Sequence, residues 1–456
     1  MKPPDATALA RSLADDATTS VALTEDALSR IAAQDSQVRA FISVTADRAI
    51  AAAAASDARR VSGASFGLLD GVPFAVKDNI AVKGVPRTSG TAAFSAPSEA
   101  DATVVARLCD AGAVLLGTLN MHEGALGAST DNPHWGACQN PLQAGFAPGG
   151  SSGGSAAAIA AGMVPMTLGT DTLGSVRIPA AYCGLWGLKP TNGRVPVTGL
   201  AHLSWTLDTI GPLARSPEDL AALMEALEGP DVNDRTGVVL PVPSDLPLSL
   251  SDLTLGVPDY EALAECEPMV VDSFKQLMTA LETAGAVLRP ITVQGWVPGA
   301  LRRAGLLVSE VEGAEIFGGV MDGPGLSEPF RAMLDYGRNA GAPRLARAYR
   351  QLQVLAVAFE NAMARLDGLL LPTAPQRAFA HGGNTPFNQA DFTALANVAG
   401  APAITMPLAA GDGGLPVAAQ IVGPRHHDHR LIAMGQLMQS LSPLSDWHDR
   451  NGSDNA

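Results

Sequence analysis

Three shortages in the sequence exclude whole classes of protein. Only four cysteines occur in 456 residues and none are spaced as CxxC, so we expect reduced core thiols rather than disulfides or metal ligands. Basic side chains number 30 against 45 acidic ones, and the net charge of −15 argues against nucleic acid as a general partner. No run of about twenty apolar residues is present, and residues 1–16 carry no apolar signal core. We therefore expect a cytoplasmic chain with no membrane association.

The remaining composition is that of a globular protein with a large core. Hydrophobic residues make up 47% of the chain and charged residues 16%, a balance that disordered chains do not have. Short apolar runs alternate with longer amphipathic stretches, which indicates an α/β sheet. Because no internal repeat divides the chain, we expect a single domain over residues 1–456.

The pattern also predicts the order of the elements. Helices are expected at 18–40, 47–60, 101–112, 217–227, 266–284, 344–366, 392–398 and 429–440. Strands are expected at 71–76, 113–116, 254–257, 286–290, 369–371, 404–406 and 417–422. Ser216 is expected to cap the helix that follows it. The stretch 229–250 is rich in proline, aspartate and serine and is predicted to be a loop.

Two clusters of glycine and hydroxyl side chains occupy the stretch 148–190. The first is GGSSGGS at 149–155, the second is GTDTLGS at 169–175, and an apolar run separates them. Glycines let the backbone approach a ligand closely, and serines beside them suit a nucleophile next to backbone amides that bind an oxyanion. The helix-like run that follows excludes a flexible linker. A phosphate loop is excluded as well, because no lysine lies between 148 and 188. From glycine content alone, plain turn chemistry remains open.

The wider pattern resembles the amidase signature family over nearly the whole chain. The motifs that carry the resemblance are GVPFAVKD at 71–78, NMHE at 120–123, DNPH at 131–134, GTDTLGSVRIPA at 169–180, GLKPT at 187–191 and DTIGPLAR at 208–215. The resemblance implies a large mixed central β-sheet flanked by helices on both faces. Residues 294–341 match the family least well and are expected to form a variable helical lobe over the site.

The resemblance also implies a catalytic triad of serine, cis-serine and lysine. Ser175 matches the family's nucleophile, and Lys77 matches its base. Ser151 matches the serine that stands between them on a cis peptide. A serine hydroxyl needs a base to become a nucleophile, and a lysine serves as a base only when it is neutral. The site must therefore lower the pKa of Lys77. No metal or other cofactor is implied, and the HHDH run at 426–429 is interpreted as the start of a surface helix.

In this family, backbone amides of the second cluster bind the oxyanion. The matching amides here belong to Thr172, Leu173, Gly174 and Ser175. The family usually has glycine where this chain has Leu173. Either the loop holds Leu173 at negative φ, or its side chain lines the substrate pocket. The charged pair Asp171 and Arg177 is expected to brace this loop rather than contact substrate.

A second departure follows Glu123, where many members of the family have a bulky aromatic residue. This chain has Gly124 and Ala125 there. The small residues either widen an apolar pocket near Met121 or reflect ordinary loop variation. We accordingly expect Met121 and Gly124 to contact the substrate.

These residues together predict serine-dependent hydrolysis of a C–N bond through an acyl-enzyme on Ser175. The expected substrate is a small molecule, namely an aryl amide, an anilide or a carbamate (urethane). The alternative is a glutaminase or amidohydrolase subunit of a larger complex, such as a tRNA-dependent amidotransferase or a biuret-type hydrolase. The intact triad argues against a non-catalytic binding protein. A homodimer is expected from the resemblance alone.

Overall fold

The computed structural model describes residues 4–234, 246–410 and 414–441. The helices are α1 (Ala6–Ala14), α2 (Ser20–Val38), α3 (Ala46–Val61), α4 (Thr103–Asp110), α5 (Gly153–Ala160), α6 (Arg177–Tyr182), α7 (Pro217–Leu227), α8 (Pro268–Thr283), α9 (Pro298–Ile316), α10 (Glu328–Arg338), α11 (Ala342–Met363), α12 (Ala394–Val398) and α13 (Asp428–Met438). The strands are β1 (Phe41–Val44), β2 (Pro73–Lys77), β3 (Val114–Leu119), β4 (Asp131–Asn132), β5 (Gly136–Ala137), β6 (Met166–Asp171), β7 (Trp186–Lys189), β8 (Thr209–Ala214), β9 (Thr254–Val257), β10 (Val287–Pro290), β11 (Gly368–Pro372), β12 (Ala403–Ala410) and β13 (Pro416–Val422).

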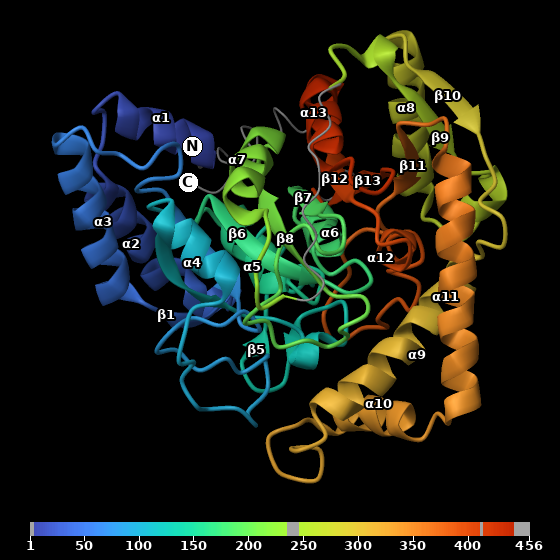
Figure 1. Cartoon of the computed structure of the whole chain (residues 1–456), viewed down its shortest axis with the longest axis horizontal. Helices are drawn as coiled ribbons and strands as arrows, with labels where there is room; N and C mark the ends of the chain where they lie inside the picture. The colour runs from blue at the N-terminus through green and yellow to red at the C-terminus, as the bar shows by residue number, and fades with distance from the viewer. Residues whose placement is uncertain (1–3, 235–245, 411–413, 442–456) are drawn as a thin grey trace.

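One large mixed sheet crosses the molecule. Its strand order is β1-β3-β2-β6-β8-β7-β12-β13-β11-β9-β10. Strands β3, β2 and β6 run parallel to one another, whereas β8 is antiparallel to β6 and β7 is antiparallel to β8. Figure 1 shows α1, α2 and α3 near one end of this sheet and α9, α10 and α11 near the other. The mixed α/β sheet expected from the sequence is confirmed.

Helices cover both faces of the sheet, so the strands between its two edges, such as β2, β6 and β8, are fully buried. Alternate residues of a strand point to opposite faces, and in β2 Phe74 and Val76 join one core cluster while Ala75 joins another. The second cluster also takes residues from α2, α3 and α5, including the alanines of the run after the first glycine cluster. None of the helices in the described residues is both long enough and apolar enough to cross a membrane.

Most of the expected elements are present, with shifts of a few residues at their ends. Ser216 caps α7 as predicted, since its Oγ accepts a hydrogen bond from the amide of Asp219. The stretch 18–40 forms one helix, α2. Strands β1, β6, β7 and β8 and helix α1 were not among the predicted elements. Part of the predicted loop at 229–250 lies outside the described residues. The four cysteines are free thiols.

Candidate active site

The residues of the candidate site come together on the side of the sheet where the parallel strands β2 and β6 end. Parallel strands end on the same side of a sheet, so Lys77 at the end of β2 lies beside Thr170 near the end of β6. The Lys77 Nζ donates to Thr170 Oγ1 at 2.8 Å. The loop carrying Ser175 follows β6 directly, and the first glycine cluster leads into α5 beside it.

Lys77 and the two serines of the predicted triad meet at this edge. The Lys77 Nζ donates to Ser151 Oγ at 2.6 Å, and both side chains are fully buried. The Gly150–Ser151 peptide bond is cis, as the sequence resemblance implies. The amide of Ser152 donates to the carbonyl of Ser175 at 3.3 Å, which holds the first cluster against the second. Of the three, Ser175 lines the cavity described below.

Burial sets the protonation of Lys77. Removal from water lowers the pKa of Lys77 to about 7, and the nearby carboxylates of Asp208 and Asp171 oppose that shift. An ordinary lysine would be almost fully protonated at neutral pH, so this environment makes the neutral, base-competent form abundant. The site therefore lowers the pKa of Lys77, as a lysine that acts as a base requires.

The rate of acylation is expected to follow the titration of Lys77. Neutral lysine is the form above its pKa, so log(kcat/KM) should rise with pH and level off, with a midpoint near 7. A pH profile with an uncharged amide substrate measures this midpoint. A profile that is flat from pH 6 to 9, or that falls across this range, would contradict a catalytic role for the neutral amine.

Asp208 connects the lysine to the loop that carries the nucleophile. Its Oδ1 accepts from Thr172 Oγ1 at 2.6 Å, and its Oδ2 accepts from the amide of Leu203 at 2.8 Å. The Nδ1 of His202 lies 3.2 Å from the same Oδ2. Asp208 had no assigned role in the sequence, although it begins the DTIGPLAR motif. The structure shows a buried carboxylate that holds Thr172 and raises the pKa of Lys77.

Replacing this carboxylate by its amide should move the pH profile. Because the negative charge of Asp208 raises the pKa of Lys77, Asp208→Asn is expected to lower it and shift the profile's midpoint toward acid. Glu312→Gln is a matched control, since Glu312 is also buried but is not among the charges that shift Lys77. An unchanged midpoint in Asp208→Asn, or an equal shift in both variants, would refute this electrostatic role.

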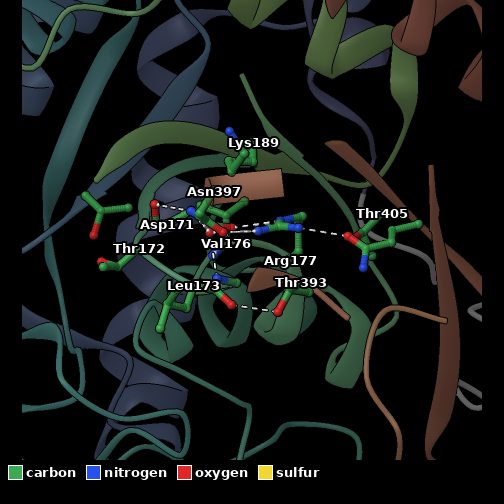
Figure 2. A network of polar contacts seen from close by, with 12 residues as sticks. Asp171, Thr172, Leu173, Val176, Arg177, Lys189, Thr393, Asn397 and Thr405 are labelled. Atoms are coloured by element: carbon green, nitrogen blue, oxygen red, sulfur yellow. Dashed lines mark hydrogen bonds and ion pairs between the residues drawn. The ribbon is translucent and has the colours of Figure 1, made fainter. Parts of the chain in front are cut away.

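A buried ion pair fixes the loop between β6 and α6. The side chains of Asp171 and Arg177 are fully buried, and Arg177 Nη2 lies 3.0 Å from Asp171 Oδ1. The Asp171 carboxylate also accepts from the amides of Gly174 at 2.7 Å and Val176 at 3.1 Å. Asn397 bonds to both members of the pair, as Figure 2 shows. These contacts are those of a loop brace, the role expected for the pair from the sequence.

The same contacts change the expected oxyanion site. The amide of Gly174 is turned toward Asp171, so in this structure it does not face the cavity as the sequence led us to expect. Gly174 itself is required, because its φ is +132° and a Cβ would collide with Thr393. Within the described residues, the amides of Thr172, Leu173 and Ser175 donate to no other residue. These three amides remain the available oxyanion donors.

Both outcomes considered for Leu173, a negative φ and a side chain in the substrate pocket, are found in the structure. Leu173 is absent from the described residues with positive φ, and its side chain lines the cavity beside Ser175. The carbonyl of Leu173 accepts from Thr393 Oγ1 at 2.6 Å, a contact drawn in Figure 2. The substitution of leucine for glycine therefore adds apolar surface to the pocket.

The cavity has a volume of about 310 Å³ and a mostly apolar wall. It is lined by Ala125, Leu126, Gly127, Ala128, Thr172, Leu173, Ser175, Ile178, Leu203, Arg302, Leu306, Ser309, Met333, Thr385, Pro386, Phe387, Gln389 and Ala390. Helices α9 and α10, inside the segment 294–341 expected as a lobe over the site, supply Arg302, Leu306, Ser309 and Met333. Met121 and Gly124, which we expected to contact substrate, are not part of this lining.

The space beside Gly124 is occupied rather than open. Phe330 of α10 packs there, so a Cβ on Gly124 would overlap its ring. Phe330 also stacks edge-on against Phe317, with ring centroids 5.1 Å apart. The small residue after Glu123 thus admits an aromatic side chain from a distant helix. Met121 is fully buried in the same apolar cluster.

Adding a methyl group at Gly124 is expected to destabilise the fold. Gly124→Ala introduces a side chain at φ +59° against Phe330 and should lower the free energy of unfolding by about 1–3 kcal/mol. Thermal or denaturant unfolding measures the loss. Gly319→Ala is the control, because nothing lies within 4 Å of a Cβ there. If Gly124→Ala is no less stable than the control, Phe330 does not occupy this space.

The run at 426–429 does not form a metal site. Asp428 accepts from the amide of Thr191 at 2.6 Å and pairs with Arg194 at 2.9 Å. His429 lies 3.0 Å from Glu228. Among the described residues no group of three or more histidine, cysteine or acidic side chains is arranged to hold a metal ion. The run lies at the start of α13, as expected, but Asp428 is fully buried rather than on the surface.

Comparisons with known proteins identify the family of this chain. The family model described as Amidase matches residues 22–432. The glutamyl-tRNA(Gln) amidotransferase A-subunit of Pseudomonas syringae pv. syringae (strain B728a) is 37% identical over 97% of both chains. A similar solved structure is 31% identical (TM-score 0.91, covering 96% of this chain and 98% of that one). It is a chain of a vestigial protein complex that reveals the evolutionary origins of an s-triazine catabolic enzyme. The peptide amidase of Stenotrophomonas maltophilia is 30% identical (TM-score 0.84, covering 96% of both).

In the described structure, a buried lysine bonded to a serine lies beside a braced loop that carries a second serine. The protein is an enzyme that acts on carbon–nitrogen bonds. It belongs to the amidase family, as its motifs indicated.

Proposed function

We propose that this chain hydrolyses an amide or carbamate through an acyl-enzyme on Ser175. Lys77 takes the proton of Ser175 through Ser151 as the serine oxygen attacks the carbonyl carbon. The amides of Thr172, Leu173 and Ser175 stabilise the oxyanion. The C–N bond then breaks and the proton passes to the leaving amine. Water, activated by the same residues, releases the acyl group.

The proposed substrate class rests on the apolar wall of the cavity beside Ser175. Leucine, isoleucine, methionine and phenylalanine side chains surround the opening beside Ser175, and Arg302 is its one charged lining residue. Burying apolar surface contributes about 25 cal/mol per Å², so such a wall favours a substrate with an apolar body. A volume of about 310 Å³ suits a small molecule. Anilides and aryl or alkyl carbamates have this shape.

A series of 4-nitroanilides tests this proposal. The purified chain is given acetyl, butanoyl, hexanoyl and benzoyl 4-nitroanilides, and release of 4-nitroaniline is followed. We expect kcat/KM to rise with apolar acyl size until the cavity is filled. Turnover of the acetyl compound alone, with no gain from larger acyl groups, would refute an apolar acyl pocket. The series is repeated with 4-nitrophenyl carbamates.

The second candidate function is a subunit of a larger complex that releases ammonia from glutamine. The names of the curated relatives favour it over the aryl-amide reading, since the matches at 36–38% identity are amidotransferase A-subunits. The s-triazine relative also comes from a protein complex. An ammonia assay with glutamine separates the two functions. Release that needs added amidotransferase partner subunits, with no anilide turnover, would establish this candidate.

The cellular location and the assembly are parts of the same proposal. A cytoplasmic location and a homodimer, both expected from the sequence, remain predictions. Size-exclusion chromatography with light scattering measures the mass of the assembly. A mass of one chain would refute the homodimer.

A further inference from the structure

One charged side chain lines the apolar cavity of the proposed acyl-enzyme site. Arg302 extends from α9, and its side chain is 12% exposed. It also lines a second cavity of about 360 Å³, and Phe387 is shared between the two. Arg302 and Phe387 therefore lie where the cavity beside Ser175 adjoins the second cavity.

The guanidinium group of Arg302 is anchored on one side only. Its Nε donates to Asp391 Oδ1 at 2.6 Å, and the ring of Phe387 lies 5.5 Å from its Cζ. Neither terminal nitrogen donates to another described residue. These nitrogens are also absent from the buried atoms that lack a partner, so they are reachable by solvent. The fixed guanidinium thus keeps unused donors at the cavity wall.

Stability alone does not account for a charged pair in this place. A buried ion pair is often no more stabilising than apolar side chains of the same volume, because both charges must leave water. The rest of the lining of the cavity beside Ser175 is apolar or uncharged, whereas the second cavity has further charged lining residues. A planar guanidinium can bind one carboxylate along its Nε edge and a second carboxylate with its terminal nitrogens. Asp391 takes the first position, and the terminal nitrogens of Arg302 donate to no other described residue.

We propose that Arg302 binds a carboxylate at the end of the substrate remote from the scissile bond. The substrate class is then an amide with an apolar body that ends in a carboxylate, such as a monoamide of a dicarboxylic acid. Asp391 orients the guanidinium for this contact. The charged residues around this end are Asp391, Glu261, Glu265 and Arg303. This inference rests on the proposed hydrolysis at Ser175.

The test compares matched neutral and acidic substrates. Hexanoyl 4-nitroanilide is neutral, and the mono-4-nitroanilide of adipic acid has nearly the same length but ends in a carboxylate. We expect the unmodified chain to prefer the acid by about 10-fold or more in kcat/KM, because charge-assisted bonds to arginine are strong. Glutaric and pimelic monoanilides locate the best length, and 4-carboxyanilides place the acid on the amine side. No acid preference at any length or on either side would overturn the proposal.

Two arginine variants separate this contact from a general charge effect. Arg302→Met should abolish the preference for the acid. Arg303→Met is the matched control, because Arg303 is the next residue on α9 and lines the second cavity but not the cavity beside Ser175. An acid preference that survives in Arg302→Met, or that disappears equally in Arg303→Met, would refute the assignment. The neutral anilide distinguishes the two proposals. If it is hydrolysed and no acid is preferred, the Arg302 contact is refuted while the proposed hydrolysis at Ser175 stands.

Discussion

Replacing Ser175 by alanine is expected to lower kcat for a 4-nitroanilide by about 10⁴-fold or more. The acyl group has no other attachment point in this account, and loss of a serine nucleophile removes most of the rate enhancement of comparable hydrolases. Ser175 is 8% exposed and lines the cavity, so removing its hydroxyl should leave the packing around it nearly unchanged. Steady-state kinetics with each purified variant measure the effect.

The control for this variant is Ser12→Ala. Ser12 lies on α1, where its Oγ donates to the carbonyl of Ala8. This variant should keep the full rate. Matching thermal unfolding curves would show that Ser175→Ala is folded. If Ser175→Ala turns over the anilide at more than about a hundredth of the parent rate, Ser175 is not the nucleophile.

Replacing Lys77 by methionine should cost about 10³- to 10⁴-fold in kcat/KM. Lys77 is fully buried and is the one basic side chain that bonds to Ser151 among the described residues. General base catalysis typically contributes 10²- to 10⁴-fold. Methionine has nearly the same length as the lysine stem, and it places no charge in the buried site, so the fold should be retained. The measurement is kcat/KM at pH 8, above the pKa of about 7.

Lys83→Met and Lys77→Arg complete this experiment. Lys83 is exposed and should tolerate the same substitution without loss. Lys77→Arg keeps the positive charge but cannot lose a proton in this pH range. It should therefore be as inactive as Lys77→Met. An arginine variant with near-normal rate would show that the positive charge at this position, rather than a neutral base, is what the reaction needs.

The sequence pointed to the three proposed catalytic residues because each lies inside a motif. Lys77 was expected at the end of a strand, and β2 ends at that residue. The brace formed by Asp171 and Arg177 was also expected. The sequence could not show that the amide of Gly174 donates to Asp171, because a hydrogen bond from an amide to a nearby carboxylate depends on the loop's φ and ψ angles.

Three adjacent strands inside the sheet, β6, β8 and β7, were not predicted, and neither was the edge strand β1. Strands β6 and β8 contain glycine and threonine, and β8 also contains proline, residues that weaken a strand pattern. Both strands are fully buried, so no alternation of polar and apolar residues marks them. The packing of Phe330 over Gly124 joins residues about 200 positions apart, and Arg302 lies about 130 residues after Ser175, so only the tertiary structure reveals these contacts.

The most direct test of the account is to identify the residue that carries the acyl group. The chain is mixed with 4-nitrophenyl N,N-dimethylcarbamate, whose carbamoyl group transfers to a serine oxygen with release of 4-nitrophenol and leaves it slowly. Intact-mass measurement followed by peptide mapping locates the adduct. We predict one carbamoyl group per chain on Ser175 and no adduct in Ser175→Ala. An adduct on Ser151 or on any residue other than Ser175 would contradict the account.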